Sequence, residues 1–170
     1  MALTTQVIGK TMPNGFAGSY AQQPDMIIDT HPAGGTAAIT FGTPLKYDGT
    51  KVVAMGASDT AAKFVGIASR EVKTTLAYLE QGVGQYAPGE PVSVFKRGVV
   101  NVICQKGTPA LGGAVYLRVT ANTSFPNAVV GGLEAEADST NTVQLTNCQW
   151  GGAADTNKVA AMRIMTIINA

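Results

Sequence analysis

Charged side chains are scarce in this sequence, and the few that occur do not gather. Lysine, arginine, aspartate and glutamate make up 14% of the chain, and the formal net charge is +1. Binding to nucleic acid through its phosphates requires a basic run or face, and the sequence has neither, which argues against such binding. Interface cores are depleted of charge, so the composition fits a surface used for protein contacts. It equally fits a β domain rich in small residues.

Residues suited to acid–base or nucleophilic chemistry are also few. The single histidine, His31, lies in a Pro/Gly-rich segment, and no serine stands in a Gly-x-Ser-x-Gly elbow. Glu134, Glu136 and Asp138 alternate at a spacing that could place three carboxylates on one side of an extended segment, but a solvated acidic loop is the simpler interpretation. We therefore expect no enzymatic activity, no catalytic residue, no cofactor and no metal ion.

The two cysteines and the apolar runs exclude further classes. Cys104 stands in an apolar run and Cys148 beside Trp150, and the sequence does not show whether the two thiols pair. No apolar run approaches the ~20 residues that span a bilayer. The first residues lack the basic and apolar regions of a secretory signal. We expect a protein that is made and used without export and does not enter membranes.

One short pattern recurs three times and indicates the fold class. A glycine, any residue and a Pro or Ala are followed by an apolar–any–apolar triplet at Gly42–Tyr47, Gly89–Val94 and Gly112–Leu117. Glycine suits a tight turn, and proline is tolerated at the first position of a strand. The alternating tail has the period of a strand. The pattern predicts an all-β, barrel-like domain of short antiparallel strands.

The chain divides by composition into an N-terminal arm, residues 1–36, and a β-barrel-like domain, residues 37–170. The arm has prolines, glycines and few charges, and it lacks strand periodicity, so we expect it to lie extended on a surface of its own domain, of a sister subunit or of another protein. In the domain, Asp48-Gly49 predicts a hairpin, and Lys96-Arg97-Gly98 predicts a turn between two strands. Residues 121–156 are predicted as a long loop with one strand at Thr142–Thr146. The segment 72–86 permits a strand pair or a short helix. A strand is favoured over a helix at Lys158–Ile168.

Several of these segments together resemble a known family. In order along the chain they are Phe41–Leu45, Phe64–Ala68, Tyr86–Val94, Arg97–Val102 and Gly112–Tyr116. The set resembles the structural cement, or capsid decoration, proteins of tailed bacteriophages. The resemblance covers residues 37–120 well, extends to the stretch Pro13–Gly18, and is only general in the last fifty residues.

The resemblance implies a location and a role. Such proteins join the outside of a phage head, often as trimers at local three-fold positions, and clamp neighbouring coat subunits. It therefore implies the major capsid protein as partner, a homotrimer on the virion surface, and synthesis in the cytoplasm of the bacterial host. An N-terminal arm commonly lies on the capsid, so the expected capsid contacts are Phe16, Tyr20, Met26 and Ile27. A head–tail joining or tail protein, and a carbohydrate- or host-binding β module, are the alternatives.

Overall fold

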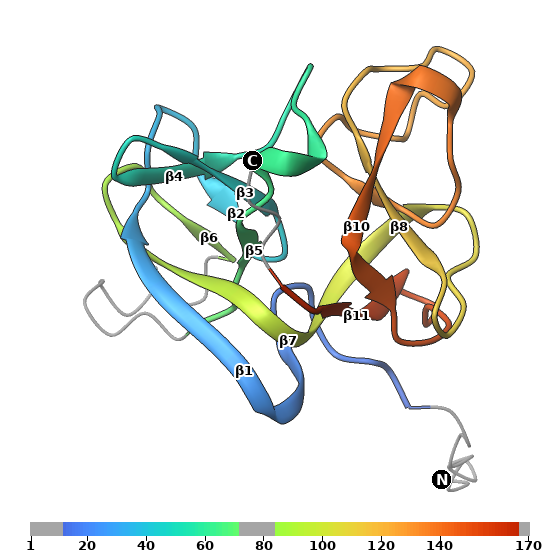
Figure 1. Cartoon of the computed structure of the whole chain (residues 1–170), viewed down its shortest axis with the longest axis horizontal. Helices are drawn as coiled ribbons and strands as arrows, with labels where there is room; N and C mark the ends of the chain where they lie inside the picture. The colour runs from blue at the N-terminus through green and yellow to red at the C-terminus, as the bar shows by residue number, and fades with distance from the viewer. Residues whose placement is uncertain (1–11, 72–83, 167–170) are drawn as a thin grey trace, which may run out of the picture.

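The computed structural model describes residues 12–71 and 84–166. Nearly all regular structure in these ranges is strand, and the helical pieces among them are two short 3-10 turns, Ala61–Lys63 and Ser139–Asn141. The predicted all-β class is confirmed (Figure 1). The strands are β1 Tyr20–Pro32, β2 Ile39–Thr40, β3 Pro44–Asp48, β4 Lys51–Ala54, β5 Gly66–Ala68, β6 Gln85–Tyr86, β7 Pro91–Lys106, β8 Ala114–Arg118, β9 Leu133–Glu134, β10 Thr142–Trp150 and β11 Val159–Ile164.

The C-terminal half of the molecule is a small closed barrel of five strands. The pairs run β7–β11, β11–β10, β10–β8 and β8–β9, and β9 returns to β7 to close the ring. All pairs are antiparallel except β7 with β9. Closure satisfies the strand edges internally, which removes the open edges through which sheets aggregate. The interior is filled by large apolar side chains, among them Trp150, Leu117 and Met162, each at most 1% exposed.

The N-terminal half forms a second, smaller ring on the same long strand. The first part of β7 pairs with β1 on one side and β5 on the other, and β5 continues to β3 and β4. A single parallel bridge between Ala33 and Val52 connects the end of β1 to β4. The two halves lie side by side in Figure 1, and β7 runs through both. The buried apolar residues form two clusters: the larger fills the barrel and extends into the N-terminal half through Phe64, Ile67 and Phe95, and the smaller lies within the N-terminal half.

The predicted turn at Lys96-Arg97-Gly98 is wrong, because β7 continues through these residues as one strand of 16 residues. The strand bends there instead. Gly98 has φ +108°, and a Cβ on it would stand 2.3 Å from the carbonyl oxygen of Asp25 in β1. Glycine is thus required at Gly98 by both backbone conformation and close approach, and these local properties resemble those of a turn.

The arm lacks strand periodicity in its sequence, yet part of it, Tyr20–Pro32, is a strand. These residues form β1, which pairs antiparallel with β7 despite register shifts between Tyr20 and Ile28. The pairing is stabilised by tertiary contacts rather than local propensity: Tyr20, Met26 and Ile28 pack against the main core. The division of the chain into an arm of residues 1–36 and a domain of residues 37–170 stays a prediction.

The strand-initiating pattern and the Asp-Gly hairpin are confirmed. Gly42, Gly89 and Gly112 all have positive φ, at +82°, +85° and +76°, and β3, β7 and β8 begin two residues after them. The Asp48-Gly49 hairpin joins β3 to β4. The long loop predicted at 121–156 is interrupted by β9, and its one expected strand is longer than predicted and ends at Trp150. The strand predicted at Lys158–Ile168 is confirmed as β11, Val159–Ile164, and the last two residues of the prediction lie outside the described residues. Most of the segment 72–86, for which a strand pair or a short helix was left open, also lies outside them.

Candidate functional site

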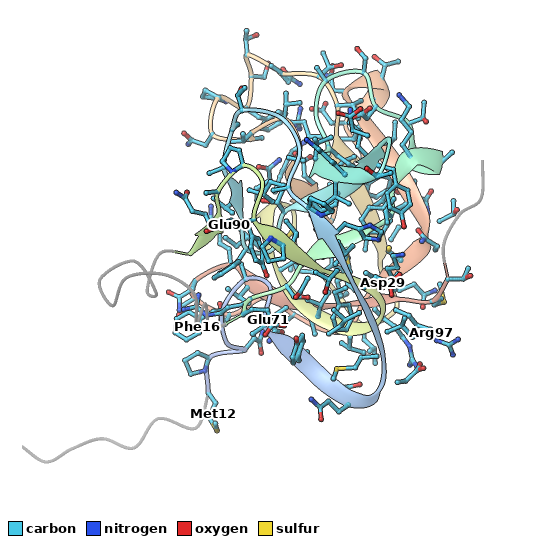
Figure 2. The ribbon with its side chains drawn as sticks, turned by 90° about the vertical axis from the view of Figure 1, so that its left-hand side faces the viewer. Met12, Phe16, Asp29, Glu71, Glu90 and Arg97 are labelled. Atoms are coloured by element: carbon cyan, nitrogen blue, oxygen red, sulfur yellow. The ribbon has the colours of Figure 1, made fainter. Side chains whose placement is uncertain are left out.

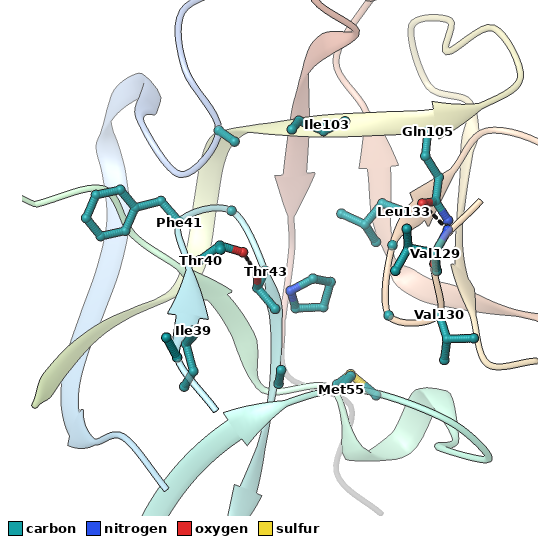
Figure 3. Close-up of a pocket in the computed structure, with 17 residues that line it drawn as sticks. Ile39, Thr40, Phe41, Thr43, Met55, Ile103, Gln105, Val129, Val130 and Leu133 are labelled. Carbon is teal, nitrogen blue, oxygen red and sulfur yellow. Dashed lines mark hydrogen bonds between the residues drawn. The ribbon is translucent and has the colours of Figure 1, made fainter. Parts of the chain in front are cut away.

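A groove of about 450 Å³ lies between the two halves of the molecule (Figure 3). One wall comes from β2 and the turn into β3, and the other from the outside of the barrel at β7 and β9. The loop that precedes β9 forms the rim. The principal apolar side chains along it are Ile39, Phe41, Met55, Ile103, Val129 and Leu133.

Among the described residues that line this groove, none carries a charged side chain. Its polar side chains are bonded to groups of the protein: the hydroxyls of Thr40 and Thr43 are 2.8 Å apart and hydrogen-bonded, and Gln105 bonds the main chain of the rim. Two apolar side chains remain open to solvent, Ile103 at 49% and Val129 at 67% exposure. A surface of this kind favours an uncharged, largely apolar partner, because a charge placed there would lose water without gaining a counterion.

Two hydrogen bonds between the Gln105 side chain and the Val129 main chain hold the rim of the groove. The Gln105 side-chain amide donates to the carbonyl oxygen of Val129 and accepts from its N–H, both at 2.9 Å. The same amide nitrogen also donates to Glu134 Oε1, at 2.9 Å. Gly131 supports the loop from the other side with φ +90°, where a Cβ would stand 2.5 Å from the carbonyl oxygen of Met55. The exposed Val129 is therefore presented on a fixed backbone.

A buried network of ion pairs continues from Gln105 into the barrel. Arg118 and Glu134 are both 0% exposed, and the guanidinium makes two bonds to the carboxylate, from Nε at 2.5 Å and from Nη2 at 3.0 Å. Arg118 also donates to Asp138 at 2.8 Å. The hydrogen bonds that Glu134 accepts raise the pKa of Arg118, and bonds from Asn122 and then Arg118 lower the pKa of Asp138.

The prediction of a solvated acidic loop at residues 134–138 is therefore wrong. Two of its three carboxylates are used in this network, because Arg118 reaches them from the neighbouring strand β8. Within the described residues no group of three or more histidine, cysteine or acidic side chains is arranged to hold a metal ion. His31 packs edge-on against Tyr47, with ring centroids 5.3 Å apart.

An aromatic cluster borders the groove on the N-terminal side. The Arg70 guanidinium lies 4.8 Å from the ring centroid of Phe16 and 5.6 Å from that of Phe41. Phe41 in turn meets Tyr86 edge-on at 5.1 Å. Burial raises the pKa of Tyr86 to about 12, so this phenol stays neutral. Phe16 is thus fixed in place by a cation–π contact while its ring remains 66% exposed.

The four residues expected to contact the capsid do not form one patch. Phe16 is exposed beside the groove, whereas Ile27, 50% exposed, pairs with Arg97 further along β1. In Figure 2 Phe16 and Arg97 stand on opposite sides of the molecule. Tyr20 and Met26 are partly buried against the core, and the Tyr20 hydroxyl donates to Glu71. The expectation of capsid contact at these positions stays a prediction.

The basic residues beside the bend of β7 are also paired internally. Lys96 bonds Asp29, and Arg97 lies 3.0 Å from Asp25 across the β1–β7 pair. The cysteines, whose pairing the sequence left open, are free and buried. Sequence reasoning missed the groove itself. The one sequence signal was the apolar pair Val129-Val130 within the polar stretch of residues 121–156.

These features define an all-β protein with a rigid apolar groove, and comparison with known proteins gives its class. A family model described as XM1 gp53 minor capsid protein matches residues 5–164. The chain belongs to this family, and it is therefore a phage capsid structural protein of the virion, as the sequence resemblance to capsid-associated proteins indicated.

A solved structure has a similar fold. A chain from "The capsid of Myoviridae Phage XM1" aligns with a TM-score of 0.68 and 19% identity, over 99% of this chain and 98% of that chain. Comparison with curated proteins found no match. Over residues 12–71 and 84–166 there is no helix of the length and apolarity that a membrane-crossing helix requires.

Proposed function

We propose that this capsid protein is a cement protein: it binds the outer surface of the phage head and stabilises the contacts between major coat subunits. The observation that carries the proposal is the charge-free groove with its fixed rim, on a chain of the minor capsid protein family. The backbone that presents Ile103 and Val129 is held by β7 and by the bonds from Gln105, so binding orders little main chain and more of the contact energy remains as affinity.

The build of the molecule suits a clamp. A closed barrel and a second ring share β7, so a pull on one half is transmitted to the other through main-chain hydrogen bonds rather than through a flexible linker. On a capsid, many such contacts act together, and individually weak sites then give stable attachment. We propose that the protein acts as a homotrimer, because closed symmetric association is self-limiting. It would act by binding alone, without catalysis.

The first test is the number of copies per virion. Quantitative mass spectrometry of purified particles, calibrated against the major coat protein, is expected to give a ratio near one to one or another lattice-wide ratio. A few copies per particle would contradict cementing and indicate a head–tail joint or a tail. Absence from particles would contradict any virion role.

The second test is reconstitution. Heads assembled without this protein are expected to lose DNA at a lower temperature than native heads, and adding back the purified protein is expected to restore the native value. Heads that bind the protein without any gain in thermal stability would contradict the stabilising role.

A further inference from the structure

The groove selects for an uncharged, extended and partly apolar segment. No described residue in its lining has a charged side chain, and the side chains of Thr40, Thr43 and Gln105 already hydrogen-bond within the protein. The exposed large side chains that remain available are aliphatic: Ile103 of β7 and Val129 of the rim, which both lie on the barrel side of the groove (Figure 3). An occupant therefore needs apolar side chains and no charged side chain.

The chain itself carries a segment of this chemistry at its N-terminus. Residues 1–9 read Met-Ala-Leu-Thr-Thr-Gln-Val-Ile-Gly and contain no charged side chain; Lys10 is the first. Its large apolar residues are Met1, Leu3, Val7 and Ile8, and the polar run Thr4-Thr5-Gln6 lies between Leu3 and Val7. The segment and the groove thus match in their apolar, uncharged side chains.

The point where this segment joins the described structure is fixed. Asn14 is anchored by its N–H to Asp155 at 2.9 Å and by its side chain to the carbonyl oxygen of Val159 at 2.8 Å. Its own carbonyl oxygen accepts from Asn101 at 2.7 Å. Met12, two residues earlier, is 87% exposed at the edge of the molecule (Figure 2). The segment therefore starts from a defined point on the surface.

The reach of the segment is comparable to the width of one molecule. The eleven residues before Met12 extend to at most roughly 40 Å, more than twice the radius of gyration of roughly 15 Å of a compact chain of 170 residues, so they can reach a copy that stands beside their own. Ala17, five residues after Met12, already lies in the wall of the molecule's own groove. To fill that groove, residues 1–9 would have to reverse and run back along residues 12–17. A groove on an adjacent copy requires no reversal.

We propose that residues 1–9 of one copy bind, extended, in the groove of a neighbouring copy. The inference rests on the proposed function in one respect, that copies stand side by side on the head. The linkage would join neighbouring cement proteins to one another in addition to the coat. The binding partner of the N-terminal segment would then be a second copy of the same chain.

The test is a site-directed cross-link between two differently tagged forms of the full chain, one carrying Val7→Cys and the other Val129→Cys. The forms are mixed on heads that lack the protein, oxidised with copper phenanthroline, and analysed by peptide mass spectrometry. The native cysteines do not interfere, because Cys104 and Cys148 are only 3% and 2% exposed. Leu111→Cys, at an 84% exposed position outside the groove lining, replaces Val129→Cys as the matched control.

The expected result is a Val7–Val129 link between the two tagged forms, at least tenfold above the Leu111 control. A link that forms only within a single chain carrying both substitutions would show that the segment fills its own groove. A link from Val7 to the coat protein would assign the segment to the capsid. Either outcome, or no link on fully decorated heads, overturns the inference and leaves the proposed function standing.

The proposed function is tested by a different measurement: it is contradicted if the wild-type chain does not decorate heads. A parallel cross-linking run in concentrated solution then decides the inference alone, with the same expected link and the same control.

Discussion

Removing Arg118 tests whether the buried ion pair stabilises the barrel and the groove rim. Arg118→Met deletes two bonds to Glu134 and one to Asp138 and leaves Glu134, 0% exposed, without its counterion. Breaking a buried pair in this way costs about 3–5 kcal/mol, because one charge stays buried and uncompensated. For a chain of this size each kcal/mol lowers Tm by about 2–4 °C, so we expect Tm to fall by about 6–20 °C.

The same reasoning predicts rescue by a second substitution. Arg118→Met combined with Glu134→Leu removes both charges, and replacing a buried pair by apolar residues is often neutral or stabilising. Asp138 can then be solvated, since its side chain is 13% exposed. We expect the double variant to recover most of the lost Tm, measured by differential scanning calorimetry and checked by urea unfolding.

A matched control is available at Lys63, an exposed cation whose partner Asp59 is buried and keeps a second ion pair with Lys46 at 2.6 Å. Lys63 lies 3.4 Å from Asp59 and is 56% exposed, so Lys63→Met should change the free energy of unfolding by less than about 1 kcal/mol. The reasoning would be refuted if Arg118→Met cost less than about 1 kcal/mol, or if the double variant were no more stable than the single one. Either result would mean that water reaches Glu134 readily.

Three further predictions concern the bend, the carboxylates and the groove. Gly98→Ala should destabilise the fold by about 1–3 kcal/mol, because the new Cβ would collide with the Asp25 carbonyl at φ +108°, and urea unfolding measures this. Asp138 has a pKa below the usual 3.8, so its contribution to stability is complete above that value and is lost as pH falls further; we expect the urea midpoint to fall below pH 4 and to hold above pH 5. Ile103→Asp should weaken head binding at least tenfold with Tm unchanged within about 2 °C, because the side chain is 49% exposed in the groove.

Each of these has its own control. Gly89 has φ +85° with no atom near its Cβ position, so Gly89→Ala isolates backbone strain and should cost less than Gly98→Ala. Asp138→Asn should reduce the loss of stability in acid; an unchanged pH profile would exclude Asp138 as its source. Leu111→Asp places the same charge at an 84% exposed site outside the groove and should leave head binding intact. Equal losses for Leu111→Asp and Ile103→Asp would exclude a specific role for the groove.

Local sequence determined the strands and turns that depend on neighbouring residues alone. The alternation of Val115 and Leu117 predicted the inward face of β8, and both are 0% exposed. Gly42, Gly89 and Gly112 marked strand starts correctly, since a positive φ is a property of the residue and its immediate turn. Family membership was also accessible, because such turn patterns recur in order along related chains.

Tertiary structure alone decided what depends on residues far apart in the chain. Arg118 follows the outward face of an alternating strand, yet it is buried because Glu134 and Asp138 reach it from beyond a loop. β1 has little strand character of its own and forms because β7 offers a partner and the core accepts Tyr20 and Met26. The groove is built from segments as far apart in the sequence as Ala17 and Leu133, and no local pattern contains it. These features form because the free energy gained by packing distant segments together exceeds the local conformational preference of each segment.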